Sequence, residues 1–85
     1  MKNEDVSNEQ VLIDIKNTKD EIRAHTMIAE GNRILSGLPE ADVQDRAYHR
    51  VKIIESETAA DCSARLLTFL LSLAEERGIT DETIL

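Results

Sequence analysis

The sequence predicts an all-α fold: an antiparallel helical hairpin of two long helices and a short C-terminal turn, dimerising into a four-helix bundle. Apolar residues recur at helical spacing on both sides of one interruption, which runs from Gly37 to Pro39. No Gly or Pro occurs between Pro39 and Gly78, and no alternating strand pattern competes. Because the connection is short, the two helices must run antiparallel.

The first helix is expected over residues 8–36, after a flexible N-terminus of residues 1–7. Ser7 can accept a hydrogen bond from a free backbone N–H, and Gln10 can complete a capping box. Gly37 is expected to end the helix in the left-handed conformation. The stripe that faces the second helix is expected to contain Val11, Ile15, Ile22 and Ala29, with Thr18, His25 and Thr26 between them.

The second helix is expected over residues 39–77. Pro39 suits the first turn because its missing N–H would be unpaired there anyway. Glu40 and Asp42 place negative charge near that N-terminus, where the helix dipole favours it. The expected apolar stripe is Ala47, Val51, Ile54, Thr58, Cys62, Leu66, Phe69 and Leu73.

A Schellman cap is expected at the end of the second helix. Gly78 can adopt the left-handed conformation, and Ile79 can fold back on Leu73 or Ala74. Residues 78–85 form the remaining tail, in which a third short helix is left open.

Both helices also carry apolar residues outside these stripes, including Ile13 and Ala24. A lone hairpin buries one face per helix, so the others need a cover. Burying a leucine is worth roughly 1.5–3 kcal/mol, more than surface ion pairs supply. We expect a homodimer; the alternatives are a different protein partner or cover by the chain's own tail. The predicted interface residues are Ile28, Leu35, Leu66, Leu67, Phe69, Leu70, Leu71 and Leu73.

A basic cluster with the chain's single tyrosine offers a candidate ligand site. Arginine matches phosphate and carboxylate geometry, and tyrosine gives a flat stacking face. An anionic ligand such as a nucleotide is therefore conceivable. The alternative is that Arg46 pairs with Asp42, His49 pairs with Asp45, and Tyr48 packs on the first helix. The candidate ligand-binding residues are Arg46, Tyr48, His49, Arg50 and Lys52.

The two histidines do not predict a metal site. Each follows a carboxylate by four residues, but helical spacing directs His49 to solvent, away from His25. A second polar pattern places Thr18, His25 and Asn32 seven residues apart on the first helix. These side chains either fix the register of a helix pair or remain hydrated at its edge.

Charge and motifs narrow the function classes. The net charge of −7 argues against nucleic-acid binding in its usual form, which needs Lys and Arg to neutralise phosphates. No phosphate-binding loop, nucleophile elbow or Cys/His metal spacing occurs, so neither an enzyme nor a cofactor is expected. Cys62, the single cysteine, should be buried and inert. It suggests a reducing, cytoplasmic environment, and no membrane span is expected.

We therefore expect a small acidic interaction protein that binds and modulates, or inhibits, another protein. Small regulators and anti-defence inhibitors of phages and other mobile elements, and small secretion chaperones, share this build. The acidic surface could imitate nucleic acid or simply aid solubility. Two alternatives stay open: an oligomeric binder of an anionic small ligand through the Arg46–Lys52 cluster, and a structural component whose oligomer is its function.

Overall fold

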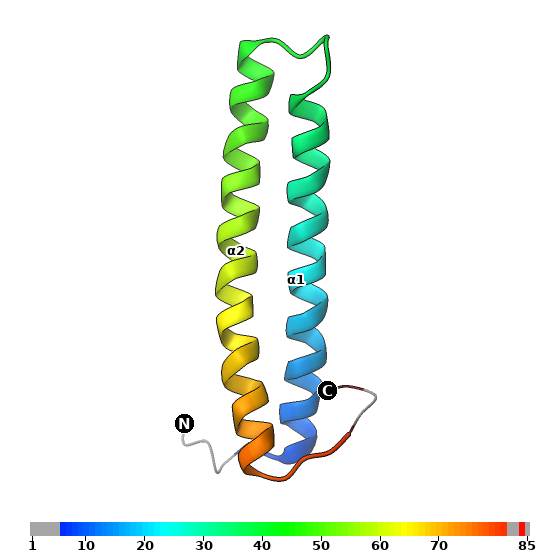
Figure 1. Cartoon of the computed structure of the whole chain (residues 1–85), viewed down its shortest axis with the longest axis vertical. Coiled ribbons are helices and arrows are strands. Elements are labelled where there is room, and N and C mark those ends of the chain that lie inside the picture. Colours follow the sequence, from blue (N-terminus) through cyan, green and yellow to red (C-terminus); the bar gives the residue numbers. More distant parts are fainter. Residues whose placement is uncertain (1–5, 82–83, 85) are drawn as a thin grey trace.

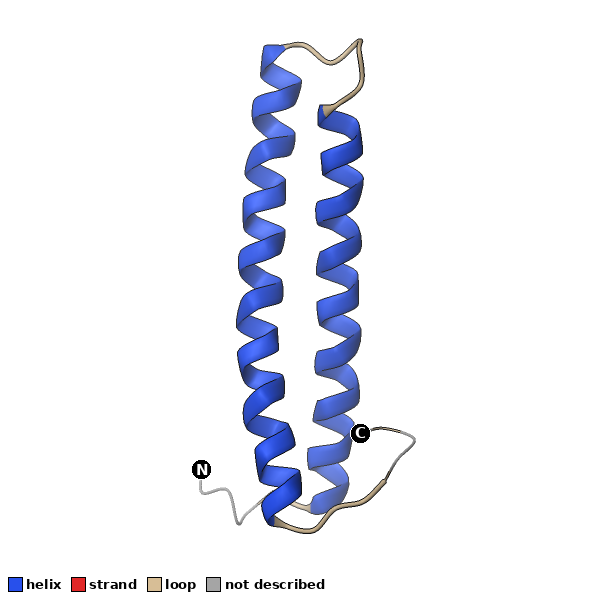
Figure 2. Cartoon of the chain, in the orientation of Figure 1, coloured by secondary structure: helices blue, strands red, loops and turns tan. Residues whose placement is uncertain are grey.

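The computed structural model describes residues 6–81 and 84, and it consists of two helices packed antiparallel (Figure 1). Helix α1 spans Asn8–Ser36 and helix α2 spans Val43–Glu76. Residues 37–42 connect them at one end of a molecule measuring 53 × 26 × 14 Å. Only helix and loop occur in the described part (Figure 2). The all-α helical hairpin predicted from the sequence is confirmed.

The caps of α1 differ from the prediction in two details. The backbone N–H of Gln10 donates to Ser7 Oγ at 3.0 Å, but the Gln10 side chain donates to Asp14 Oδ1 at 2.8 Å. Only half of the expected capping box therefore forms. At the other end Gly37 has φ −91°, in the right-handed region, and its N–H donates to Ile34 O at 3.1 Å. The predicted left-handed stop at Gly37 is wrong.

Helix α2 begins at Val43, not at the predicted residue 39. Asp42 is the N-cap: its Oδ1 accepts from the Asp45 N–H at 2.8 Å, and its own N–H donates to Asp45 Oδ2 at 3.4 Å. This reciprocal capping box satisfies two N–H groups that the helix leaves unpaired. The box fixes the start of the helix, and Pro39 remains in the connecting loop.

The predicted Schellman cap at the end of α2 is confirmed. Gly78 has φ 68°, in the left-handed region that favours glycine. The N–H of Ile79 donates to Ala74 O at 3.0 Å, and that of Gly78 donates to Glu75 O at 3.1 Å. Ile79 also packs against the hydrophobic core. The cap therefore turns the chain back over the end of the hairpin.

The hydrophobic core lies at the end of the hairpin opposite the connecting loop (Figure 1). Its buried members are Val11, Ile15, Leu70, Leu73 and Ala74. Partly buried side chains cover it: Leu67 of α2, and Val6, Ile79 and Ile84 from the segments that flank the helices. The Lys19 Nζ donates to the Ile84 carbonyl at 2.7 Å, which ties the tail to α1. The tail therefore seals part of the leucine-rich segment.

Between this core and the loop, the helices meet through small and polar side chains. Thr18, Ala29 and Ser56 are buried there, and the Thr18 hydroxyl donates to Asp14 O at 2.7 Å. Steps of three and four residues separate the inward positions on both helices, as in an antiparallel coiled coil. We call these positions the seam: Val11, Ile15, Thr18, Ile22, His25, Ala29, Asn32 and Ser36 on α1, and His49, Ile53, Ser56, Ala60, Ser63, Leu67, Leu70 and Ala74 on α2.

The predicted inward face is right for α1 and wrong for α2. On α1 all of the predicted positions except the exposed Thr26 lie in the seam. On α2 only Leu73 of the predicted stripe is buried, and Cys62 is exposed rather than buried. Small side chains such as Ser56 and Ala60 allow close approach of the helices but give little hydropathy signal. The large apolar residues of α2 that face away from α1 are Val51, Ile54, Leu66 and Phe69.

Candidate interaction surface

An apolar stripe runs along the outside of α2. We call it the outer stripe: Val51, Ile54, Thr58, Cys62, Leu66 and Phe69, all exposed. Its four largest members are 48–59% exposed. Because a helix turns about 100° per residue, the mean direction of the stripe is opposite to Ala60, which is half-buried in the seam. The outer stripe thus points away from α1 along about five turns of helix.

Exposed apolar side chains on α1 gather toward the loop end. Met27, Ile28, Ile34 and Leu35 are all exposed there. Gly31 lies among them, and a Cβ added to it would meet nothing within 4 Å. This part of α1 is therefore a second open apolar surface, with a gap at its centre.

The eight predicted interface residues fall into two groups. Leu67, Leu70 and Leu73 belong to or pack against the core of their own hairpin. They face α1 and the described segments that flank the helices because they share the inward side of α2, so the prediction that a second chain buries them needs correction. The other five remain exposed: Ile28, Leu35, Leu66, Phe69 and Leu71. Their burial by a second chain stays a prediction.

The predicted ligand-binding cluster is split between two directions. Tyr48 is exposed, with the Lys52 Nζ 5.5 Å from its ring centroid. Its ring meets the His49 ring edge-to-face at 5.3 Å. His49, however, turns inward, and its Nδ1 lies 2.8 Å from Asn32 Oδ1. The prediction that His49 faces solvent is wrong, since the seam of α2 passes through it.

The hollow beside His49 does not suit an anion. It has a volume of about 260 Å³ and is lined by two carboxylates, Glu40 and Asp45, besides apolar side chains. These negative charges oppose a phosphate or carboxylate ligand. Arg46 and Arg50 are exposed on α2 and do not line this hollow. This hollow therefore does not support the hypothesis that the cluster binds an anionic ligand.

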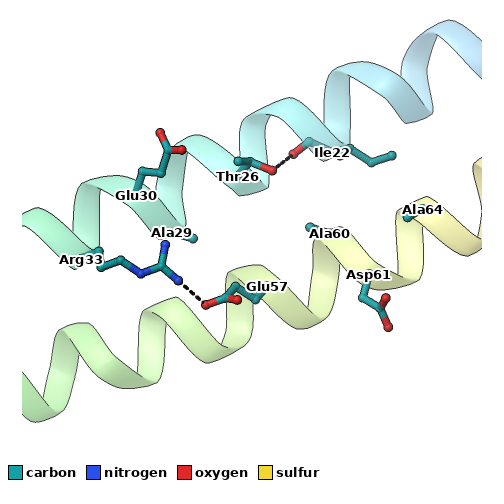
Figure 3. A pocket seen from close by; sticks show the side chains of 9 residues that line it. All are labelled: Ile22, Thr26, Ala29, Glu30, Arg33, Glu57, Ala60, Asp61 and Ala64. Carbon is teal, nitrogen blue, oxygen red and sulfur yellow. Dashed lines mark hydrogen bonds and ion pairs between the residues drawn. The ribbon is translucent and has the colours of Figure 1, made fainter.

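A second groove lies between the two helices near their middle (Figure 3). Ala29 and Ala60 line it, and its cation, Arg33, reaches Glu57 Oε1 at 2.7 Å. The Thr26 hydroxyl donates to Ile22 O at 2.8 Å. Arg33 and the Thr26 hydroxyl thus both have partners within the chain. The side chains that line the groove do not form a pair of nucleophile and activating base.

Metal binding gains no support from the histidines. His25 and His49 are both half-buried seam residues, and His49 is held by Asn32. Within residues 6–81 and 84, no three His, Cys, Asp or Glu side chains cluster as metal ligands. Neither helix of that part is long and apolar enough to cross a membrane.

Comparisons identify no relative: no protein-family model, curated protein or solved structure matches this chain. Its function must therefore be inferred from its own surface.

Four members of the outer stripe were predicted from the sequence to face the first helix only, and Val51 and Ile54 are the largest of them. Val51 and Ile54 were expected between the helices but lie outside them. The signal that could have placed them is the spacing of Ser56, Ala60 and Ser63, which matches the seam spacing of α1. If those small residues face inward, Val51 and Ile54 must face outward.

Proposed function

We propose that this chain is a non-enzymatic interaction protein that binds and modulates another polypeptide through the outer stripe of α2. The observation that supports this most is the arrangement of α2 outside the core, where Ser56 and Ala60 face α1 while large apolar residues such as Ile54 lie on the outer stripe. A hairpin that worked alone would gain stability from the opposite arrangement. Contiguous exposed apolar surface on a small protein is typical of a binding site.

The free energy available on this surface also favours a protein partner. Val51, Ile54, Leu66 and Phe69 are each about half exposed. Burying the rest of each side chain contributes on the order of 1 kcal/mol. Exposed ion pairs such as Lys16–Asp20, at 4.0 Å, contribute less. Four such side chains in one stripe therefore make apolar contact the main source of affinity.

Other classes of partner fit less well. The phosphate backbone of a nucleic acid would be repelled by a chain of net charge −7. A catalytic role needs a nucleophile or acid–base pair held in a cleft, and the groove between the helices offers alanines and an ion pair that is already formed. An apolar helical surface on a protein partner matches the outer stripe in both shape and chemistry.

Site-specific photo-cross-linking in cells tests this proposal. A photoreactive amino acid at Ile54 or Leu66 should give protein adducts, since both positions lie on the outer stripe. The matched control is Glu30, an exposed position on α1 that lines the groove between the two helices. Adducts that form equally at Glu30, or none at either stripe position, would contradict the proposal.

A further inference from the structure

We infer that the occupant of the outer stripe is a second copy of this chain, with the two α2 helices antiparallel about a two-fold axis near Ala60. This inference rests on the proposed function and names its partner. It follows from how the apolar and charged residues of the outer surface are placed relative to Ala60, and it fixes one of the two possible orientations of a dimer.

The apolar residues of the outer stripe are symmetric about Ala60. Val51 and Phe69 lie nine residues on either side of it, and Ile54 and Leu66 lie six residues on either side. Two antiparallel helices related by a two-fold axis bring positions equally far from the centre to the same level. Large side chains would then meet large ones at both ends of the contact.

The centre of the outer stripe suits a close approach of the two helices. Thr58 and Cys62 lie two residues on either side of Ala60, and both are smaller than the apolar residues that flank them. Helices in contact pack about 8–10 Å apart, depending on the side chains between them. Small residues at the crossing point and larger ones outside it therefore fit a self-complementary surface.

Charges on the same segment select the antiparallel orientation. Glu55 and Arg65 lie five residues on either side of Ala60, so each would reach the level of the opposite charge in the other copy. Within their own chain they meet only exposed partners, Lys52 at 3.5 Å and Asp61 at 3.0 Å. A parallel dimer would instead place Glu55 level with Glu55 and Arg65 level with Arg65.

No like charges oppose each other across the rest of the segment from Val51 to Phe69. Lys52 would come level with Thr68, Glu57 with Ser63, and Asp61 with Ala59, as the sequence positions require. Binding to a different protein would not require residues of α2 to be placed symmetrically about Ala60. The pattern therefore favours a second copy over a different protein.

Thiol cross-linking reports the orientation directly. In the antiparallel dimer the two Cys62 thiols are separated by four residues along the axis, about 6 Å. A short bismaleimide should therefore give covalent dimers of the full-length chain. The matched control is Cys62→Ser combined with Ser72→Cys, at an exposed position of α2. Its thiols would lie about 36 Å apart along the axis, so no covalent dimer should form.

A charge exchange supplies an independent test by sedimentation velocity. Glu55→Arg and Arg65→Glu should each weaken dimerisation on the order of tenfold, because two pairs per dimer become repulsive. The double variant should recover an affinity close to that of the natural sequence, while circular dichroism shows unchanged helix in all three.

Each contrary outcome overturns the inference in a defined way. Covalent dimers of both the natural chain and the Cys62→Ser, Ser72→Cys control mean a parallel dimer. A double variant that stays as weak as the single ones means that Glu55 and Arg65 do not meet. A chain that remains monomeric, with photo-adducts to another protein at Ile54, overturns the second copy but leaves the proposed function standing.

Discussion

The Nδ1 of His49 lies 2.8 Å from the Oδ1 of Asn32, and this contact joins the two helices near the loop. The Asn32 amide nitrogen donates to Ile28 O at 2.8 Å, which orients Oδ1 toward α2. Because Oδ1 can only accept, the His49 tautomer that fits this contact carries a hydrogen on Nδ1. Asn32 thus connects the helices through a polar seam position, the kind of residue that fixes register in helix pairs.

Replacing Asn32 by Ala should destabilise the hairpin by about 1 kcal/mol, because the half-buried His49 Nδ1 loses its acceptor. Urea unfolding followed by circular dichroism measures this change. Asn17→Ala is the matched control, since Asn17 is an exposed residue of the same helix. Both variants gain the same helix propensity, so equal stabilities would show that the contact with His49 contributes nothing.

Two glycine substitutions should change stability in opposite directions. Gly78→Ala should cost about 1 kcal/mol or more, because φ 68° is unfavourable for a residue with a Cβ. Gly31→Ala should stabilise α1 by about 0.5–1 kcal/mol, because Gly31 is inside a helix and open space surrounds its missing Cβ. The melting temperatures of the two variants test this prediction. A lower melting temperature for both variants would contradict it.

The capping box of α2 should be worth about 1 kcal/mol. Asp42→Ala removes the Oδ1 that accepts from the Asp45 N–H and should lower the stability by that amount. Asp42→Asn keeps an acceptor oxygen and should retain most of it. Glu40→Ala, an exposed change two residues earlier, is the control. If Glu40→Ala costs as much as Asp42→Ala, the start of α2 is set by charge rather than by the cap.

The same substitution four residues apart should have different consequences. Leu70 is 6% exposed in the core, whereas Leu66 is 48% exposed on the outer stripe. Leu70→Ala should cost about 2–5 kcal/mol of folding stability through the cavity it creates. Leu66→Ala should leave the fold intact and reduce the dependence of the melting temperature on protein concentration, as loss of dimer contact requires. Melts at several concentrations separate the two effects, and a concentration-independent melt for the natural chain would contradict the second one.

The fold class can be predicted from the sequence because the helical spacing of apolar residues and the positions of Gly and Pro do not depend on tertiary contacts. The face of α1 follows equally well, since Val11 and Ile15 begin the predicted stripe and are fully buried. For α2 the most apolar stripe does not face the other helix, because Ser56 and Ala60 pack inward and Ile54 points outward. Hydropathy selects the largest apolar stripe, whereas helix pairing also depends on which side chains allow close approach.

Two local features depend on contacts that spacing cannot reveal. The start of α2 follows the reciprocal bonds of Asp42 and Asp45, which compete with Pro39 for the first turn. The inward direction of His49 depends on its bond to Asn32, seventeen residues away. The outer stripe was consequently predicted only in part: Leu66 and Phe69 were assigned to an interface, and its other four members were not.

Sedimentation equilibrium of the natural chain beside Ile54→Glu tests the central claim most directly. The outer stripe predicts a mass of twice the 9.5 kDa chain for the natural sequence. It predicts a single-chain mass with unchanged helix content for Ile54→Glu, because a carboxylate would be buried without a partner at the contact. A natural chain that stays at 9.5 kDa at every concentration, or an Ile54→Glu variant that dimerises equally well, would contradict it.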